Sequence, residues 1–356
     1  MANYSVDRYF IVDNKSILLD FPDIEKYDSE KMFKIYDNWP EIAEEAYFSN
    51  LKKIEIKDIE HIVFAGMGGS GAIGDTFASI LSKTKIHVTI VKGYVLPNTT
   101  DAKSLVITTS ISGNTIETLT ILEEAKKRGS KIIAISSGGK MEKFCKENKL
   151  DFRKISQIHS PRTSFVRFFY SILKILQPIV PITNEEIIES IKKMKELRED
   201  ISSSNLSDNN PALKLASSIT KIPLIYYPWG LHASAIRFKN SLQENSKMHA
   251  IMEDVIEASH NGIVAWENIA NVQPILVEGQ DDNIKTKERW KILKEFFEEN
   301  KIEYKEIFSL NGNIITKITN LIYLFDYTSI YKAVLSKIDP SPVSSIDYIK
   351  SRLNNE

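Results

Sequence analysis

Short runs of apolar residues alternate with longer amphipathic stretches along most of this chain. The apolar runs predict buried strands, and the stretches between them have the spacing of amphipathic helices. The elements predicted for the first half are strand 61–65, helix 71–81, strand 87–91, strand 105–108, helix 115–128 and strand 131–136. Because strands that alternate with helices form mostly parallel sheets, the pattern predicts an α/β fold with doubly wound sheets and helices on both faces.

Two helical segments flank this alternating pattern. Residues 29–50 have mixed helical spacing and several aromatic residues, which predicts helices that pack beneath the first sheet. Residues 164–176 are apolar over much of a helical circumference, which predicts a core helix that closes the first half.

The second half repeats the alternation after a polar break. Thr183 and Glu186 form a capping box before a charged helix that runs to Ile201, and the polar stretch 202–210 follows. Asn210 and Pro211 have the order of an N-cap and a first helical residue. The elements predicted beyond them are strand 222–227, helix 234–248, strand 250–255, strand 272–277, helix 285–299, strand 303–309 and helix 314–336.

This organisation predicts three regions. They are an N-terminal arm with helices (1–50), a first domain (51–201) and a second domain (210–356) that ends in a further helix. The two halves share the order of elements but no obvious sequence repeat, so a duplication is inferred from the pattern alone.

Composition and charge narrow the class of protein. Hydrophobic residues make up 42% and charged residues 26% of the 356 residues, which is typical of a globular protein with a packed core. Lysine and arginine (46) nearly balance aspartate and glutamate (47), which argues against a broad nucleic-acid surface. A bound anion must therefore be held by a few groups at one place rather than by a broad basic surface.

Cysteine content and apolar segments predict a cytoplasmic protein. Cys145 is the single cysteine, so no internal disulfide can form. Residues 1–10 carry charge and lack the apolar core of a signal peptide. The most apolar stretch, 165–182, is interrupted by charged residues and prolines, so we expect no membrane span.

A glycine-rich turn follows the first predicted strand. Its sequence, Gly66-Met67-Gly68-Gly69-Ser70-Gly71, resembles the three spaced glycines of a dinucleotide-binding turn. Such a site also needs an acidic residue near the end of the next strand, where this chain has Val91-Lys92-Gly93. A turn that only lets helix and strand pack closely is a further interpretation.

A hydroxyl-rich loop follows the predicted strand 105–108. Ser110-Ile111-Ser112-Gly113-Asn114-Thr115 stands at the start of a predicted helix. Helix starts offer unpaired N–H groups and the positive end of the helix dipole, so a phosphomonoester can bind there without a basic cluster. A serine run that only caps the helix would use one hydroxyl and would leave the others unexplained.

Together these motifs resemble those of the bifunctional phosphoglucose/phosphomannose isomerases, whose two domains are sugar isomerase (SIS) domains. The resemblance rests on GMGGSGAIGD, SISGNTIET, Asn38-Trp39-Pro40, Pro161-Arg162, Asn210-Pro211-Ala212, Glu244-Asn245-Ser246-Lys247, Glu257-Ala258-Ser259-His260-Asn261 and Asp339-Pro340. It extends over nearly the whole chain and implies an isomerase with two SIS domains.

The resemblance also implies the site residues. For the substrate phosphate these are Gly69, Ser70, Ser110, Ser112 and Thr115. Arg162 matches the arginine that stabilises the enediol, and a fixed cation suits the negative charge that develops there. A surface arginine near a domain seam is the structural alternative for this residue.

Glu244 matches the family's base, because a carboxylate can move a proton between carbon 2 and carbon 1 on one face of a cis-enediol. It lies seven residues after Arg237 on a predicted helix, so the two side chains share a face with Ser241 between them. An exposed helix glutamate is the alternative. The motif here has Gln243 and Ser246 where many relatives have asparagine and alanine.

The remaining implied residues open the sugar ring. His260 matches the acid/base, and imidazole is suited to proton transfer near neutral pH. In relatives this histidine reaches the partner subunit's site, which implies a homodimer with shared sites. Lys350 is the best match for a ring-opening lysine, with Lys337 less favoured, and a small hydroxyl residue for mannose 6-phosphate could be Ser341, Ser344 or Ser345.

The expected function is therefore the interconversion of glucose 6-phosphate, and mannose 6-phosphate, with fructose 6-phosphate through ring opening and a cis-enediol. No cofactor is expected, and no metal, because the chain has no His/Cys cluster with ligand spacing. The alternatives are a non-catalytic SIS-domain sensor of sugar phosphates and an isomerase of another sugar phosphate. No nucleic-acid or membrane partner is expected.

Overall fold

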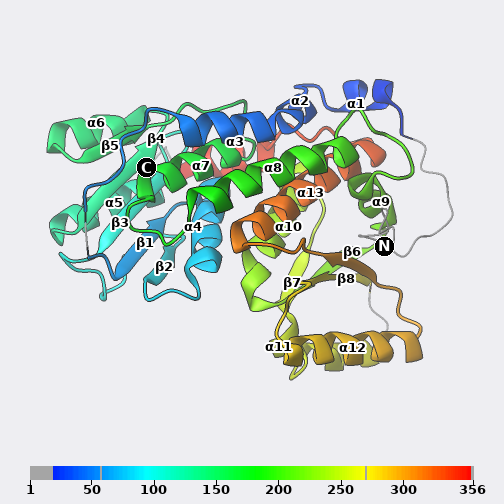
Figure 1. Ribbon diagram of the computed structural model, residues 1–356. Helices are drawn as coiled ribbons and strands as arrows, with labels where there is room; N and C mark the ends of the chain where they lie inside the picture. The colour runs from blue at the N-terminus through cyan, green and yellow to red at the C-terminus, as the bar shows by residue number, and fades with distance from the viewer. Residues whose placement is uncertain (1–18, 57, 269–270, 354–356) are drawn as a thin grey trace.

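The fold is built on two parallel sheets joined by a layer of helices (Figure 1). The computed structural model describes residues 19–56, 58–268 and 271–353. The first sheet has the strand order β2-β1-β3-β4-β5, with every neighbouring pair parallel. Its strands are β1 (His61–Ala65), β2 (His87–Val91), β3 (Leu105–Ser110), β4 (Lys131–Ser136) and β5 (Asp151–Lys154).

The second sheet has the order β7-β6-β8-β9 and is also parallel throughout. Its strands are β6 (Ile222–Tyr227), β7 (Ile251–Asp254), β8 (Val272–Glu278) and β9 (Lys305–Phe308). This order matches the first four strands of the first sheet, because β6 and β8 take the central places of β1 and β3. The predicted α/β architecture with two parallel sheets is confirmed.

Helices cover both faces of the first sheet. Alternate strand residues face opposite sides, so Phe64 and Ile107 belong to one core cluster and Val63 and Val106 to another. The first face packs on α4 (Gly68–Leu81) and α7 (Phe165–Leu176), and the second on α5 (Ile116–Lys127) and α6 (Gly139–Asn148).

A central layer of helices lies between the two sheets (Figure 1). It contains α8 (Asn184–Ile201), α9 (Pro211–Ser218), α10 (His232–Asn245) and the long α13 (Ile314–Leu335), which is buried around most of its circumference. The N-terminal helices α1 (Phe21–Tyr27), α2 (Met32–Asp37) and α3 (Trp39–Phe48) complete this layer. The outer face of the second sheet packs on α11 (Val255–Ala258) and α12 (Ile284–Glu299).

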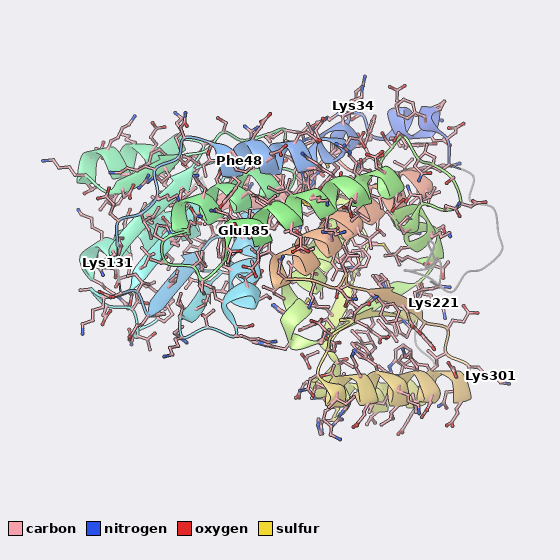
Figure 2. All side chains as sticks on the ribbon, viewed as in Figure 1. Lys34, Phe48, Lys131, Glu185, Lys221 and Lys301 are labelled. Atoms are coloured by element: carbon pink, nitrogen blue, oxygen red, sulfur yellow. The ribbon has the colours of Figure 1, made fainter. Side chains whose placement is uncertain are left out.

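Charged side chains are spread over the surface. Lys34, Glu185 and Lys301 are exposed and come from three separate helices or helix ends (Figure 2). No helix of the described residues is both long enough and apolar enough to span a bilayer.

Most predicted elements lie within a few residues of the observed ones, and the differences have local causes. The capping box is present, since Thr183 accepts from the Glu186 N–H and the Glu186 carboxylate accepts from the Thr183 N–H. Helix α4 begins at Gly68, not near Gly71, so the glycine turn is itself the first turn of the helix. The prediction omitted α6 and β5, in which charged residues outnumber apolar ones and hide the periodicity.

Candidate active site

The two loops singled out in the sequence lie side by side at the carboxyl edge of the first sheet. Strands β1 and β3 are parallel neighbours, so the turn after Ala65 and the loop after Ser110 leave the same edge. The approach is close, because a Cβ atom at Gly66 would lie 2.9 Å from the carbonyl oxygen of Thr109. In open parallel sheets, ligands usually bind just outside the carboxyl ends of the strands.

Ser110 holds the hydroxyl-rich loop together. Its side chain is 1% exposed. Its Oγ lies 2.9 Å from the Thr115 Oγ1 and accepts from the Gly113 N–H at 3.1 Å. The loop thus curls around the Ser110 hydroxyl, which fixes the direction of the N–H groups that follow it.

Helix α5 begins in this loop without a side-chain cap. Its N-cap residue Thr115 makes no capping hydrogen bond, because its hydroxyl is turned to Ser110. The first-turn N–H groups of the helix therefore lack side-chain acceptors and can donate to an anion. Ser112 is exposed at the same end of the helix.

Gly113 of the loop and Gly138, which follows β4, lie in close contact. Gly113 has φ 73°, and a Cβ atom there would overlap the Gly138 carbonyl group. The Asn114 Oδ1 accepts from the Lys140 N–H at 3.0 Å, which fastens the loop to the start of α6. Gly113 is thus required by both backbone conformation and space.

The glycine turn of α4 brings Arg162 to the loops. Gly69 is buried, and a Cβ atom there would lie 3.1 Å from the Pro161 carbonyl oxygen and 3.5 Å from the Arg162 Cα. Ser70, the next residue, is 8% exposed, and its hydroxyl bonds to none of the described residues. The turn therefore serves close packing, and it also places the N-terminus of α4 beside Arg162.

The turn that carries Arg162 is held by hydroxyl and indole groups. The Thr163 and Ser164 hydroxyls both donate to the Ile158 carbonyl oxygen, at 2.8 and 2.9 Å. The Trp39 indole N–H donates to the Thr163 carbonyl oxygen at 3.0 Å, which gives the Asn38-Trp39-Pro40 motif a structural role.

Arg162 and Glu244 meet between the two halves of the chain. The Arg162 side chain is 5% exposed, and its Nη1 lies 3.6 Å from the Glu244 Oε2. Its Nη2 donates to the carbonyl oxygens of Pro340 and Ser341, at 2.7 and 2.8 Å, whereas its buried Nε has no partner. A buried donor without a partner is costly, and this Nε is left unpaired among the described residues.

Glu244 lies in the last turn of α10, which is anchored on α13. The Asn245 Nδ2 donates to the Ser329 Oγ and the Ser246 hydroxyl donates to the Ser329 carbonyl oxygen, both at 2.8 Å. The Glu244 side chain itself remains 27% exposed. The motif thus fixes the helix end and leaves the carboxylate accessible.

Two further residues lie near this pair: Lys247, which had no role in the sequence prediction, and Ser341, one of the three hydroxyl candidates named there. The Lys247 Nζ donates to the Glu244 carbonyl oxygen and, at 3.1 Å, to that of Pro340. Burial, together with the nearby Arg162 cation, lowers the pKa of Lys247. Ser341 is 8% exposed, and its buried hydroxyl has no partner. The motif Glu244-Asn245-Ser246-Lys247 was the available signal for Lys247.

His260 and Lys350 are not brought to Arg162 and Glu244 by any contact within the chain. Both are exposed, and neither side chain has a hydrogen bond or ion pair with the described residues. His260 follows α11, and Lys350 lies on α14 (Ser344–Leu353), a helix with no buried residue. The single chain therefore assembles half of the predicted catalytic set.

The end of β2 does not favour a dinucleotide site. Lys92, rather than a carboxylate, follows this strand, and its Nζ lies 2.6 Å from the Oδ2 of the buried Asp75. A dinucleotide site needs an acidic residue here to bind the ribose, and this position is instead taken by a lysine in an ion pair.

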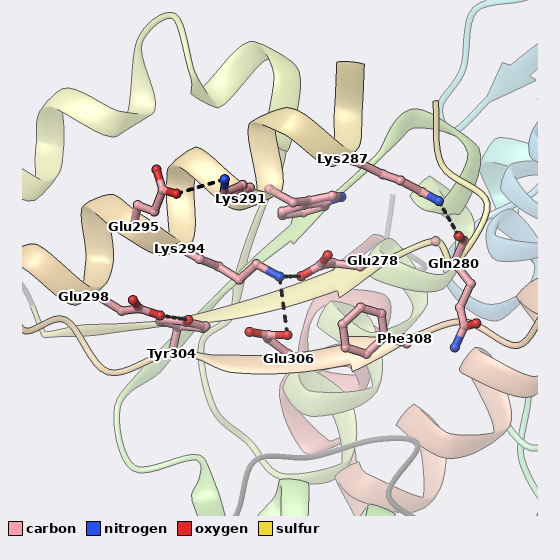
Figure 3. Close-up of a pocket in the computed structure, with 12 residues that line it drawn as sticks. Glu278, Gln280, Lys287, Lys291, Lys294, Glu295, Glu298, Tyr304, Glu306 and Phe308 are labelled. Atoms are coloured by element: carbon pink, nitrogen blue, oxygen red, sulfur yellow. Dashed lines mark hydrogen bonds and ion pairs between the residues drawn. The ribbon is translucent and has the colours of Figure 1, made fainter. Parts of the chain in front are cut away.

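A cavity of about 780 Å³ lies away from these residues, between α12 and strands β8 and β9 (Figure 3). Its polar groups satisfy one another: the Lys294 Nζ lies 3.0 Å from Glu278 and 3.5 Å from Glu306, and Tyr304 donates to Glu298. Among the described residues, no group of three or more His, Cys, Asp or Glu side chains could hold a metal ion.

Comparison with family models matches both halves of the chain. Residues 55–177 match the model of the SIS domain. Residues 208–353 match the model described as the bacterial phospho-glucose isomerase C-terminal SIS domain. The first match contains both loops and Arg162, and the second contains Glu244, His260 and Lys350.

Relatives of known description cover nearly the whole chain. The bifunctional phosphoglucose/phosphomannose isomerase of Caldicellulosiruptor bescii is 33% identical over 335 residues, which are 90% of this chain and 98% of that protein. The D-glucosamine-6-phosphate 4-epimerase of Sulfolobus acidocaldarius is 28% identical over 71% of this chain and 78% of its own length. A glucose-6-phosphate isomerase like protein from Thermus thermophilus shares the fold, with a TM-score of 0.58 and 14% identity over 91% of this chain and 95% of that one.

Proposed function

The chain belongs to the family of bifunctional phosphoglucose/phosphomannose isomerases, and from that membership we propose how its residues perform the reaction. It is an isomerase that interconverts glucose 6-phosphate and mannose 6-phosphate with fructose 6-phosphate. The observation that supports the site is the Arg162–Glu244 pair, with its unpartnered Nε, beside two loops suited to a phosphate.

The substrate phosphate binds at the start of α5. Ser112 is exposed and the helix has no side-chain cap, so the Ser112 hydroxyl and first-turn N–H groups donate to the phosphate oxygens. Thr115 contributes its hydroxyl, while Ser110 contributes by holding the loop. Gly69 and Ser70 supply donors from the start of α4, next to Arg162.

Glu244 and Arg162 carry out the proton transfer on the open-chain sugar. The Glu244 carboxylate removes a proton from the carbon beside the carbonyl, and the carbonyl oxygen gains negative charge as the enediolate forms. The Arg162 guanidinium, which lies beside Glu244, stabilises that oxygen by its fixed positive charge. The hydroxyl proton on the neighbouring oxygen passes to the enediolate oxygen, and Glu244 returns its own proton to the neighbouring carbon as the new carbonyl forms there.

His260 and Lys350 open the sugar ring, and we propose that His260 does so in the site of a second subunit. Its imidazole is exposed and unpaired in the described chain, as expected of a group that works across a dimer interface. Lys350 lies on α14, which follows directly on the Pro340–Ser341 segment bound by Arg162. A homodimer with shared sites accounts for both placements.

Ser341 is our choice for the hydroxyl that accepts mannose 6-phosphate as well as glucose 6-phosphate. Its Oγ is buried and unpartnered, and its carbonyl oxygen binds Arg162. Ser344 and Ser345 lie on the exposed α14 instead. A hydroxyl near Arg162 can donate to the sugar C2 oxygen of either epimer.

The domain division proposed for the chain is 1–50 for the N-terminal segment, 51–201 for the first SIS domain and 210–356 for the second. Each domain contains one of the two sheets. The phosphate substrate and the single cysteine favour a cytoplasmic location.

The test is a turnover assay with purified full-length protein. Fructose 6-phosphate is supplied and glucose 6-phosphate is measured with a coupled dehydrogenase; mannose 6-phosphate is then tested as the substrate. Turnover of both aldoses is expected. Binding without turnover would favour a sensor, and turnover of glucosamine 6-phosphate alone would favour the chemistry that the Sulfolobus relative's name describes.

A further inference from the structure

A buried ion pair lies directly behind the proposed site. Arg237 of α10 is 2% exposed, and Asp326 of α13 is fully buried. The Arg237 Nη2 lies 2.6 Å from the Asp326 Oδ2, and its Nε donates to the Oδ1 at 3.0 Å. The guanidinium carbon also lies 4.9 Å from the centre of the Phe165 ring.

The pair reaches Arg162 through the main chain. The Arg237 Nη2 also donates to the Arg162 carbonyl oxygen at 2.7 Å. One guanidinium thus joins three segments: the turn that carries Arg162, helix α10 and helix α13. A lysine could not make the same bonds, because the planar fork supplies donors in fixed directions.

The pair also fixes the helix that carries Glu244. The Ser241 hydroxyl donates to the Asp326 Oδ1, one turn before Glu244 on α10. Asn245 and Ser246 bond to Ser329 of α13, just after Glu244. Polar bonds to α13 therefore hold α10 on both sides of the carboxylate.

Packing alone does not require this arrangement. A buried ion pair has a large desolvation cost, and apolar residues of the same size often stabilise a core equally well. The chain instead keeps a charged pair at the point where the two proposed reacting residues meet. The distance between Arg162 and Glu244 depends on how the turn and α10 are set relative to each other.

We infer that Arg237 and Asp326 are positioning residues, which hold the Arg162 main chain and the Glu244 helix at the separation that proton transfer requires. The inference rests on the proposed roles of Arg162 and Glu244. Neither Arg237 nor Asp326 needs to touch the substrate, since both are buried behind the pair.

The pair also sets the charge around Glu244. The charged and titratable groups that face this carboxylate are Arg162, Arg237, Lys247 and the buried Tyr36. Asp326 neutralises Arg237, so the loss of either partner changes the net charge near Glu244 by one unit. Removal of Asp326 leaves a positive charge, and removal of Arg237 leaves a negative one.

The test compares D326N, R237Q and the double variant R237Q/D326N in the full-length protein. Each single variant should lower kcat by about tenfold to hundredfold with little change in KM, since small displacements of reacting groups have effects of this size. In the pH profile of kcat/KM, the acidic limb should move to lower pH in D326N, which leaves a positive charge near Glu244. It should move to higher pH in R237Q, which leaves a negative charge. In the double variant, which has no unpaired charge, the limb should return near the wild-type position.

Wild-type kcat in folded D326N and R237Q, or limbs that stay in place, would overturn the inference. R237K is a milder variant that guards against loss of folding, because lysine keeps the positive charge but lacks the planar guanidinium. We expect R237K to have a lower kcat at nearly unchanged thermal stability. A wild-type kcat in R237K would contradict the positioning role. An E244Q control separates the claims: if E244Q stays active, the proposed base is wrong, whereas an inactive E244Q beside fully active pair variants refutes only the positioning role.

Discussion

The loops that follow β3 and β8 occupy equivalent places in the two sheets and differ in chemistry. Beyond β3 the chain has Ser110 to Thr115, with hydroxyls and an uncapped helix start. Beyond β8 it has Gly279 to Asn283, where Asp282 accepts from the Gly279 N–H and the Trp290 indole, and Asp281 pairs with Lys317. Asn283 caps the helix through the Lys285 N–H.

The difference shows that the strand order does not specify the ligand. The first-turn N–H groups of α5 lack side-chain acceptors, whereas carboxylates and an amide of the second loop take up the donors there. The second half contributes instead through α10 and α13, which bring Glu244 to Arg162. Each half therefore supplies one part of the site.

The largest effect is expected at Glu244. E244Q removes the proposed base and should lower kcat by about a thousandfold, while KM and inorganic phosphate binding change little because the proposed phosphate loop is intact. A control carboxylate from the same half is Glu278, at the end of β8 and away from Arg162. E278Q should keep wild-type kcat in the same coupled assay, and equal losses in the two variants would show that the loss in E244Q is not specific to the candidate site.

A mixture of subunits tests how sites are shared. H260A should lower turnover of ring-form substrate by about a hundredfold, because it removes the proposed acid/base of ring opening. When E244Q and H260A subunits are refolded together, each mixed dimer has one site with both residues intact, so activity should rise well above that of either variant. Activity that stays at the level of the separate variants would contradict sites built from two subunits.

A smaller effect is expected in the phosphate loop. S112A removes one hydroxyl donor to a charged ligand and should raise KM for fructose 6-phosphate by about tenfold, with kcat nearly unchanged. Gln280 is the control, because each residue is exposed and lies two positions beyond the end of its strand. Q280A should leave KM unchanged, and a rise in KM for Q280A alone would place the phosphate in the wrong half.

The smallest kinetic effect, but a clear effect on stability, is expected at Glu278. Burial, partly offset by Lys294, raises the pKa of Glu278 from 4.5 to about 7 in the folded chain. The folded state then binds more protons than the unfolded state between these values, so stability is lost as pH rises from 4.5 through about 7. The loss is on the order of 3 kcal/mol, and E278Q should remove it. Chemical denaturation at pH 5 and pH 8 measures the change in unfolding free energy. An equal loss of stability in E278Q would show that Glu278 is not the group responsible.

Local sequence signals predicted most of the fold. Apolar runs give β1, β4 and β6 at the observed residues, and caps at Thr183 and Asn210 mark α8 and α9 correctly. Helix α6 was missed because its charged residues mask two buried positions, Met141 and Cys145. Such signals are local, and they are strong where an element is buried along most of its length, as β1 and β4 are.

The candidate site could be predicted only in part, because its groups come from distant segments. The family resemblance named Arg162 and Glu244, and the structure places them 3.6 Å apart. Arg237 and Asp326 are 89 positions apart in the sequence, and hydrophobic periodicity cannot predict a contact between such distant residues. Lys350 is the reverse case: the resemblance assigns it a role, but in the described chain it is exposed on α14 and is not brought to Arg162 and Glu244 by any contact.

The most direct test of the account is deuterium incorporation from D₂O during the isomerisation of fructose 6-phosphate. NMR of the glucose 6-phosphate formed reports whether carbon 2 carries solvent deuterium. The account predicts deuterium at carbon 2 with the wild type, and none above background with E244Q at saturating substrate. Product without deuterium from the wild type, or incorporation by E244Q at the wild-type rate, would contradict proton transfer by Glu244.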